Sequence, residues 1–348
     1  MFETLALAVF RHQFECNAPY RAYCERRGAS PDSVRSWAEI VAVPTDAFRA
    51  APLICGGPES AVAAFRTSGT TAGAARRGTH YFHDLSLYDA ALRAGFSAHL
   101  LPDGVRLLIL SLVPAPADAP DSSLSHMMGE VVEALGTGGS RFLVGPGGLE
   151  LESTIAALRE AERESRPVLV AGTSFAFVHL IDALRERVER IALPAGSRGM
   201  DTGGFKGRSR EVEREELYAA LAQTLGVPVE WWVNEYGMTE MSSQFYDGRA
   251  GAAGEVAGRV HRGPGWVRTR AFDPESLEPV RDGEVGVLRH WDLANLDSVL
   301  ALQTADLGRV VPGGFQLLGR AQGAEARGCS IAMDELLSAL AGAPSRGP

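Results

Sequence analysis

Lysine is nearly absent from this chain of 348 residues. Of its 34 basic side chains, only Lys206 is a lysine, and all the others are arginines. Wherever any cation would serve, the chain carries arginine. The lone ammonium is either a chance survivor in an arginine-biased sequence or a group kept for chemistry that a planar guanidinium cannot reproduce. Composition alone gives these two explanations equal weight.

Cysteine is also scarce: the four residues are Cys16, Cys24, Cys55 and Cys329, and no two of them form a CxxC pair. That spacing disfavours a structural zinc site. Charged residues interrupt the apolar residues of MFETLALAVFRHQFEC at the start, which argues against a signal peptide. Scattered cysteines without an export signal predict reduced thiols in the cytoplasm, with the first three structural.

Long apolar runs and an excess of positive charge are missing as well. The net charge is −9, so no general attraction to nucleic acid or to an anionic membrane is expected. No apolar run is long enough to span a bilayer, so membrane insertion is not expected. Anionic substrates would need local cations.

The residue pattern alternates between strands and helices. Apolar runs at 105–114, 141–144, 167–172 and 227–233 predict strands, and helical spacing at 150–165, 174–188 and 209–225 predicts helices between them. Ser209 is the expected N-cap of the last helix, with Gly226 beyond its end. The pattern indicates α/β layering with a largely parallel sheet.

The two ends of the chain follow other patterns. Residues 1–50 are predicted to be helical and to close in a loop at 43–45, and a helix is expected at 333–340. After about residue 255, turn signals at Asp273-Pro274 and Asp282-Gly283 predict antiparallel hairpins.

The first candidate binding segment is the loop FRTSGTTAG at 65–73. Small hydroxyl residues and glycines offer O–H and backbone N–H donors to phosphate oxygens without steric obstruction. The GxxxxGK[ST] spacing of a P-loop is absent. A flexible surface loop is the commoner origin of such a composition and stays open as the alternative.

Two further segments offer groups that suit a nucleotide. NEYGMTE follows the strand predicted at 227–233, and ligands of open α/β sheets bind at the carboxyl ends of strands. Tyr236 offers a stacking ring, Thr239 a hydroxyl for phosphate and Glu240 a carboxylate for Mg²⁺. Downstream, Asp306 in QTADLG could accept both ribose hydroxyls, and Arg320 could hold ribose or phosphate oxygens. Taken singly, each has an ordinary structural explanation as a turn or a surface arginine.

Taken in order, the segments are more specific. The TSGTTAG loop, EYGMTE, the DGEVGVL hairpin, TADLG and the final Gly-Arg resemble the adenylate-forming enzymes: acyl-CoA ligases, nonribosomal-peptide adenylation domains and luciferases. The resemblance implies an α/β fold, namely the N-terminal domain of an adenylate-forming enzyme, with stacked mixed sheets, flanking helices and a small β-rich subdomain. It implies a domain at 1–318, with 255–318 its β-rich part, and a short C-terminal stub at 319–348.

The same resemblance implies ATP and Mg²⁺ as cofactors. Thr239 would touch the α-phosphate, Glu240 would bind Mg²⁺, and Asp306 would bind the ribose hydroxyls with Arg320 nearby. The nucleotide would also contact residues of the glycine-rich loop and of the second segment: Thr67, Ser68, Gly69, Thr70, Thr71, Tyr236 and Gly237.

Within that superfamily the chain resembles the LuxE-type acyl-protein synthetases, which supply acyl groups to a reductase for aldehyde formation. The supporting pieces are FRHQFECNAPYRAY, VPTDAFR, SSLSHMM, DTGGFKG and AEARGCSIAMDEL, which span essentially the whole chain. By this resemblance Cys329 stands where such proteins carry an acylated cysteine, and a thioester would keep the acyl group reactive. The alternative is a small packed cysteine.

Two lysines of the superfamily pattern are missing from this chain. The phosphate loop continues with Ala-Ala-Arg-Arg instead of Pro-Lys, and the usual C-terminal domain of about a hundred residues, with its late lysine, is not present. Lys206 is therefore the candidate substitute, because an ammonium could neutralise the encounter of carboxylate and phosphate. Gly203 and Gly204 beside it are candidate substrate contacts. A surface lysine on a mobile loop is the alternative.

His126 is the remaining candidate substrate contact, either lining the acyl pocket or orienting the carboxylate; a packed core histidine is the alternative. The resulting hypothesis is ATP-dependent formation of an acyl-adenylate, acyl transfer to Cys329, and handover to a partner such as an acyl reductase or acyl carrier. An adenylating ligase that uses coenzyme A or a carrier protein, and a non-catalytic nucleotide- or acyl-binding relative, stay open. Fatty and aromatic acids are equally open as substrates.

Overall fold

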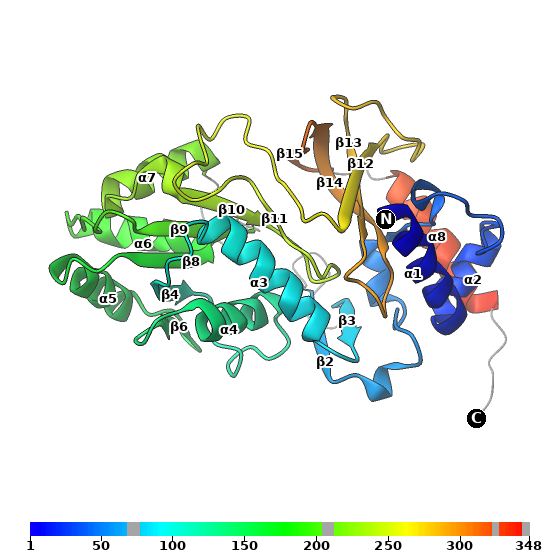
Figure 1. Cartoon of the computed structure of the whole chain (residues 1–348), viewed down its shortest axis with the longest axis horizontal. Coiled ribbons are helices and arrows are strands. Elements are labelled where there is room, and N and C mark those ends of the chain that lie inside the picture. The colour runs from blue at the N-terminus through cyan, green and yellow to red at the C-terminus, as the bar shows by residue number, and fades with distance from the viewer. Residues whose placement is uncertain (68–76, 204–211, 322–326, 343–348) are drawn as a thin grey trace. The chain divides into compact units, whose positions relative to one another are not determined.

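The computed structural model describes residues 1–67, 77–203, 212–321 and 327–342, with only the backbone at 327–332 and 341–342 (Figure 1). The described chain forms two compact units. Unit 1 holds residues 1–88, 238–243 and 263–348, and unit 2 holds residues 89–237 and 244–262. The domain bounds expected from the sequence stay a prediction.

Unit 2 is built on a six-stranded sheet with the order β11-β10-β9-β8-β4-β5. All neighbours pair in parallel except β11, which is antiparallel to β10. The predicted alternation of strands and helices around a largely parallel sheet is therefore confirmed. The elements are α3 (Ser86–Leu100), β4 (Leu108–Leu112), α4 (Ser123–Leu135), β5 (Arg141–Phe142), β6 (Val144–Gly145), β7 (Gly148–Leu149), α5 (Leu151–Arg163), β8 (Val168–Thr173), α6 (Ser174–Glu186), β9 (Arg198–Thr202), α7 (Arg214–Leu225), η5 (Val229–Trp231), β10 (Trp232–Tyr236) and β11 (Phe245–Tyr246).

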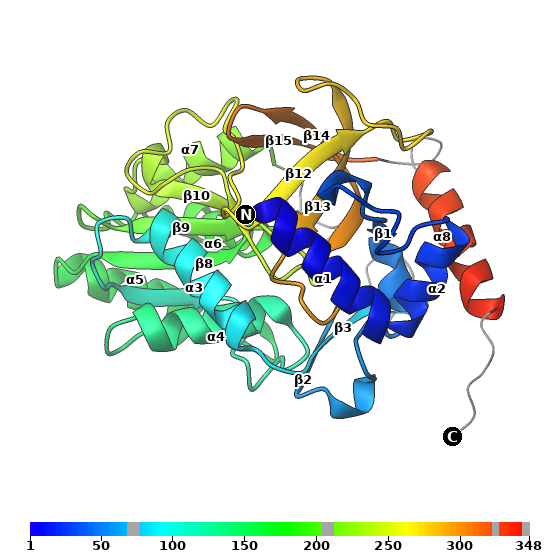
Figure 2. The same ribbon diagram turned by 45° about the vertical axis from the view of Figure 1, so that its right-hand side comes forward.

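The central strands β4 and β8 are apolar runs because both faces of the sheet are covered. Leu108, Leu110 and Leu112 of β4 share one core with Trp232 and with apolar residues of α5, α6 and α7. Figures 1 and 2 show α3 and α4 in front of the strands, on the opposite face. The sheet is thereby held rigid, and its strand ends become fixed positions for polar side chains.

Helix α7 begins later than the sequence predicts. Its N-cap is Glu213 and its first residue is Arg214, while Ser209, the predicted cap, lies outside the described residues. Val212 is buried ahead of the helix, and Glu215 and Glu216 supply the acidic first turn. The prediction of a helix from residue 209 is wrong at its start, because Val212 and Glu213 precede the first helical residue.

Unit 1 contains a five-stranded sheet of order β1-β14-β13-β12, with β15 also paired to β14, and a separate β2-β3 hairpin. The predicted antiparallel hairpins after residue 255 are confirmed in β12 to β15. The elements are α1 (Phe2–Cys16), α2 (Ala18–Arg26), η1 (Trp37–Glu39), β1 (Val43–Pro44), η2 (Thr45–Arg49), η3 (Pro58–Ser60), β2 (Ala63–Arg66), β3 (Thr79–Phe82), β12 (Val267–Phe272), β13 (Val285–Asp292), β14 (Ala301–Val311), β15 (Gly314–Arg320) and α8 (Arg327–Gly342).

Two sequence predictions are wrong in unit 1. The loop expected at 43–45 contains the short strand β1, parallel to Leu302 and Gln303 of β14, and Pro44 is tolerated because β1 is an edge strand. Cys16 and Cys55 form a disulfide, so the expectation of reduced thiols fails for this pair. Local sequence could not reveal it, because the fold brings the end of α1 to a distant loop. No described helix is both long and apolar enough to cross a membrane.

Candidate functional site

The predicted phosphate loop joins the two strands of the β2-β3 hairpin. At the base of the hairpin, the Thr67 N–H donates to the Gly78 carbonyl oxygen at 2.9 Å, and the Gly78 N–H donates to Thr67 Oγ1 at 2.9 Å. A side chain at Gly78 would lie 3.2 Å from Phe48 Cβ and 3.4 Å from Arg49 Cγ, so the hairpin base rests on η2. Ser68, Gly69, Thr70 and Thr71 lie outside the described residues.

A buried histidine of β3 holds the second predicted segment. His80 Nδ1 lies 2.9 Å from the carbonyl oxygen of Thr239. Burial lowers the pKa of His80 to about 4, so the ring is neutral and its Nδ1–H donates to that oxygen. Thr239 is thereby fixed beside the hairpin that carries Thr67. The sequence gives no signal for His80, because a single histidine outside any motif is not distinctive.

We expect replacement of His80 by phenylalanine to loosen the Thr239 segment while keeping the ring's packing. The Thr239 carbonyl would lose its donor, which should cost about 1–3 kcal/mol of unfolding free energy and raise the KM for ATP. Asparagine, whose amide can replace the Nδ1–H, should restore most of the ATP affinity. Denaturant titration and ATP binding on both variants check this; equal ATP affinity in the phenylalanine variant would remove the positioning role.

Glu240 is buried near charged residues of two other segments, η2 and β15. The pKa of Glu240 is raised to about 7, mainly by burial and also by the Asp46 carboxylate, while Arg49 and Arg320 act to lower it. The backbone of this segment is fixed because Asn295 Nδ2 donates to the Glu240 carbonyl oxygen at 2.9 Å. Near neutral pH, Glu240 is therefore a fixed carboxyl group poised between its two protonation states.

Asp306 and Arg320 occupy opposite positions on β14 and β15. Arg320 Nε lies 3.8 Å from Asp306 Oδ1, with the arginine largely exposed and the aspartate mostly buried. Thr304 Oγ1 accepts a hydrogen bond from the Asp306 N–H at 3.0 Å. The carboxylate predicted for ribose and the guanidinium predicted beside it thus face one another.

These contacts bring five predicted residues together within unit 1. The hairpin base with Thr67 rests on η2, and Arg49 of η2 and Arg320 of β15 both act on Glu240. His80 holds Thr239, and Arg320 faces Asp306. One region therefore combines hydroxyls, carboxylates and the local cations that an anionic ligand of this acidic protein would require.

Tyr236 and Gly237, from the same motif as Thr239, belong to unit 2. Tyr236 ends β10, and its ring lies 5.9 Å from both the Phe245 and His261 rings. A Cβ atom at Gly237 would lie 2.5 Å from Glu235 Oε1, so a larger residue there would displace the Glu235 carboxyl group. Burial raises the pKa of Glu235 to about 7, although a hydrogen bond from the Thr202 hydroxyl acts to lower it.

The segment predicted to hold Gly203, Gly204 and Lys206 follows the carboxyl end of β9. Gly203 follows β9 with a φ of 70°, a left-handed conformation that favours glycine. Ser174 Oγ donates to the Gly203 carbonyl oxygen at 3.1 Å and to Asp201 Oδ2 at 2.9 Å. Gly204 and Lys206 lie outside the described residues. The loop that carries them therefore starts from a fixed point at a ligand-binding edge of the sheet.

His126 is neither a core residue nor isolated. Its Nε2 lies 2.7 Å from Asp89 Oδ1, and Arg93 Nη1 donates to Glu130 Oε2 at 2.9 Å on the same helices, α3 and α4. Asp89, His126 and Glu130 lie close enough to hold a metal ion together. His126 is partly buried, with 20% of its side chain exposed, and its role as a substrate contact stays a prediction.

Cys329 lies in the first turn of α8, and its side chain is outside the described atoms. Helix α8 packs against α2, and Arg27 pairs with Glu335 of α8. The remaining described thiol, Cys24, is buried, and burial raises its pKa to about 12. Cys24 is therefore protonated at neutral pH and a poor nucleophile.

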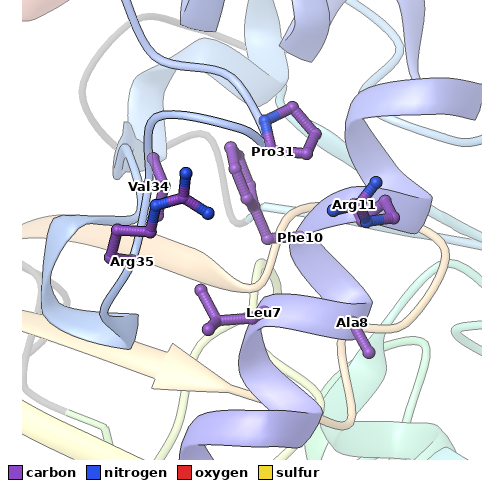
Figure 3. Close-up of a pocket in the computed structure, with 7 residues that line it drawn as sticks. All are labelled: Leu7, Ala8, Phe10, Arg11, Pro31, Val34 and Arg35. Atoms are coloured by element: carbon purple, nitrogen blue, oxygen red, sulfur yellow. The ribbon is translucent and has the colours of Figure 1, made fainter.

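A cavity of about 210 Å³ on unit 1 contains none of the predicted site residues (Figure 3). Its apolar wall comes from α1 and the loop after α2, with two arginines at the sides: Leu7, Ala8, Phe10, Arg11, Pro31, Val34 and Arg35. This cavity therefore does not mark the predicted site, which is identified by the contacts among its side chains.

Known proteins match the chain along most of its length. A family model described as acyl-protein synthetase, LuxE, matches residues 1–338. The long-chain-fatty-acid–luciferin-component ligase of Vibrio harveyi is 21% identical over 96% of this chain and 88% of its own. The ligase of the same description from Aliivibrio fischeri is 23% identical over the same shares.

Solved structures share the fold at low identity. An open conformation of 2-hydroxyisobutyryl-CoA ligase in complex with 2-HIB-AMP and CoA aligns with a TM-score of 0.63 at 16% identity, over 91% of this chain and 73% of that one. ATP-bound MatB from Rhodopseudomonas palustris aligns with a TM-score of 0.52 at 15% identity, over 83% of this chain and 52% of that one. The chain thus spans about half of the MatB chain, and the predicted fold is confirmed.

Proposed function

The chain belongs to the LuxE family of acyl-protein synthetases, and from that membership we propose that it activates a carboxylic acid with ATP and passes the acyl group through Cys329 to a partner protein. The relatives' description as long-chain-fatty-acid ligases favours a fatty acid as substrate; an aromatic acid is the other candidate. The partner we propose is an acyl reductase or an acyl carrier.

The observation that carries this proposal is the convergence of Thr67, Thr239, Glu240, Asp306 and Arg320 within unit 1. The threonine hydroxyls suit the phosphates, and a carboxylate suits the ribose hydroxyls. Arg49 and Arg320 supply positive charge in a protein whose net charge is −9. This combination of groups fits a nucleoside triphosphate better than an uncharged ligand.

In the first step, a carboxylate oxygen of the acid attacks the α-phosphorus of ATP, and pyrophosphate leaves with the electrons of the broken P–O bond. The attacking group is already ionised, so no general base is required. The protein orients the two anions and neutralises their charge, with Thr239 at the α-phosphate and Lys206 between the reactants.

In the second step, the Cys329 thiolate attacks the carbonyl carbon of the acyl-adenylate. AMP leaves with one oxygen of the original carboxylate, and a thioester remains on the protein. The partner's nucleophile then takes the acyl group and regenerates the thiolate.

Mg²⁺ would be held by Glu240, and the nearby Asp46 carboxylate fits the preference of this ion for oxygen ligands. When bound, it supplies positive charge that offsets the charge of the phosphates. The buried position of Glu240 suits this role, because a carboxylate removed from water gains most from a bound cation.

An ATP–pyrophosphate exchange screen over saturated fatty acids and aryl carboxylates tests the proposed function. We expect acid-dependent return of labelled pyrophosphate into ATP for at least one class of acid. If no acid supports exchange in a folded protein that binds ATP, the chain is a non-catalytic nucleotide-binding relative and the proposal is wrong.

Replacing Glu240 with glutamine should separate function from stability. Exchange should fall roughly 100-fold, because the proposed metal ligand is lost. The raised pKa means that the folded state holds this proton more tightly than the unfolded state. The Glu240 contribution to stability is therefore lost as pH rises from about 4.5 towards 7. At pH 8, without ligand, the glutamine variant should be about 1–3 kcal/mol more stable.

Glu235→Gln is the matched control, because burial also raises the Glu235 pKa to about 7. It should show a similar gain in stability at pH 8 with an unchanged dependence on Mg²⁺ concentration. In the unaltered protein, the KM for Mg²⁺ should rise as pH falls below 7. An unchanged Mg²⁺ dependence in Glu240→Gln would remove Glu240 as the metal ligand.

A further inference from the structure

Four groups that bind transition metals lie near the end of α1, and none of them is assigned to ATP. His12 and Cys16 stand one helical turn apart on α1, Cys55 belongs to the loop before η3, and Asp297 lies between β13 and β14. The ligand atoms of His12, Cys16 and Cys55 lie within 4.8 Å of one another. His12 Nε2 also lies 3.2 Å from Asp297 Oδ1.

We propose that, when the Cys16–Cys55 disulfide is reduced, the two thiolates, the His12 imidazole and the Asp297 carboxylate form a tetrahedral Zn²⁺ site. Thiolate, imidazole and carboxylate are the ligands this ion takes in proteins, and four of them complete a closed site. The sequence disfavoured zinc because no CxxC pair is present; here the paired ligands are a histidine and a cysteine one helical turn apart.

The distances around His12 match the edges of a zinc tetrahedron. With Zn–S of about 2.3 Å and Zn–N or Zn–O of about 2.1 Å, the N···S edges are about 3.6 Å and the N···O edge is about 3.4 Å. His12 Nε2 lies 3.6 Å from Cys16 Sγ, 3.6 Å from Cys55 Sγ and 3.2 Å from Asp297 Oδ1. The two sulfurs must move, since as thiolates they would part to about 3.8 Å. The Asp297 carboxylate, which lies outside the group of ligand atoms within 4.8 Å of one another, must turn towards them.

Hydrogen bonds that do not involve sulfur hold the three segments in place. The Cys55 N–H donates to the Asp297 carbonyl oxygen at 2.8 Å, and the Gly56 N–H donates to the Cys16 carbonyl oxygen at 3.2 Å. Buried Gln13, on α1 between the two ligands, donates through Nε2 to the Asn295 carbonyl oxygen at 2.6 Å. The ligands should therefore stay adjacent after reduction, so the site is preorganised for the ion.

The burial of the ligands suits binding from solution. Cys55 is buried at 6% exposure, whereas the His12 side chain is 46% exposed and the Asp297 side chain 33%. The ion can enter from the solvent side and close on a thiolate that is shielded from water. With two thiolates and one carboxylate, the occupied site would carry a net charge of about −1. Because His12 and Asp297 are partly exposed, water can solvate this charge.

Reduction of the Cys16–Cys55 disulfide requires an added reductant. A phosphine reductant supplies two electrons, the S–S bond breaks, and two protons from water complete the thiols while the phosphine takes up oxygen. Zn²⁺ then displaces both protons and binds the thiolates. The site thus exists only in the reduced protein.

Cobalt(II) titration of the reduced, metal-stripped full chain under anaerobic conditions tests the site. We expect a thiolate-to-cobalt charge-transfer band and intense tetrahedral d–d bands, both abolished by one equivalent of Zn²⁺. The disulfide form should show neither. If the reduced, folded protein gives no charge-transfer band, the cluster is a thiol–disulfide pair only and the proposal is wrong.

Single variants identify the ligands. Cys16→Ser and Cys55→Ser should each weaken Zn²⁺ binding more than about 100-fold, and Asp297→Asn about 10-fold, since even an outer-shell partner is worth 10–100-fold. Cys24→Ser, at the buried free thiol, is the matched control and should leave the spectrum unchanged. Retention of the charge-transfer band by both serine variants at 16 and 55 would place the metal elsewhere. Pyrophosphate exchange is measured separately, so failure of either proposal is recognised independently.

Discussion

Replacing Lys206 with alanine should slow ATP–pyrophosphate exchange about 10²–10³-fold, the loss expected when one preorganised electrostatic group is removed from a transition state. ATP binding should change far less, because other groups hold the nucleotide in the ground state. Exchange kinetics at saturating ATP, with ATP affinity measured separately, distinguish the two effects.

The physical reason is the repulsion between the two reactants. A carboxylate must approach an α-phosphate that already carries negative charge, and a cation between them lowers that barrier. Lys206 is the only lysine of the sequence, and the loop that carries it follows Gly203 at the carboxyl end of β9. An ammonium there concentrates its charge on one atom, whereas a guanidinium spreads it over a plane.

Two variants control for charge and for position. Lys206→Arg keeps the charge and should recover only part of the rate, because the planar group cannot occupy the same point. Arg208→Ala removes a cation two residues away and should leave exchange within a few-fold of the unaltered rate. If Lys206→Ala exchanges at the normal rate, the lysine has no part in adenylate formation.

Replacing Cys329 with serine should abolish covalent acylation while leaving pyrophosphate exchange intact. The first step does not use the thiol, and a serine hydroxyl is a far weaker nucleophile than a thiolate. Cys329 lies in the first turn of α8, where the helix N-terminus favours a negative charge. Radiolabelled acid and ATP, followed by release of the label with neutral hydroxylamine, measure the thioester directly.

Cys24→Ser is the matched control for this experiment. Burial raises the Cys24 pKa to about 12, so this thiol should not be acylated, and its loss should leave the covalent label in place. Persistent labelling and downstream transfer in Cys329→Ser would show that the acyl group bypasses this cysteine. Transfer to coenzyme A or a carrier protein would then be the better account.

Local pattern was enough to predict the parallel sheet of unit 2. Strands β4 and β8 are apolar runs because both faces are covered, whereas β9, with the sequence RGMDT, was not predicted. Gly226, with a φ of 69°, ends α7 where the sequence places a stop. The predicted start of α7 was wrong. Glu213 precedes the helix, while Glu215 and Glu216 form its first turn. Such boundaries depend on where the chain enters the core, as Val212 shows by its burial.

The candidate site was only partly predictable from the sequence. Thr67, Thr239, Glu240 and Asp306 stand in motifs whose order is informative, so their residue types could be assigned to nucleotide chemistry. His80, which holds Thr239, and Asn295, which holds Glu240, belong to no motif. The raised pKa of Glu240 depends on burial and on Asp46, Arg49 and Arg320, which only the fold brings together.

The metal-binding cluster was beyond sequence reasoning for the same reason. His12 and Cys16 lie on one helix, but Cys55 and Asp297 come from loops that pair through backbone hydrogen bonds far apart in the chain. Long-range pairings of this kind leave no periodic signal. The disulfide and the zinc site proposed in its place both depend on them.

The transfer of carboxylate oxygen tests most directly whether the chain forms an acyl-adenylate. The acid that gives the fastest exchange is labelled with ¹⁸O in its carboxylate and turned over with ATP, and the phosphorus products are analysed by mass spectrometry. We predict one ¹⁸O atom in AMP and none in pyrophosphate, because the carboxylate oxygen that attacks the α-phosphorus leaves with AMP. Label in inorganic phosphate together with ADP, or unlabelled AMP after acyl transfer, would contradict the account.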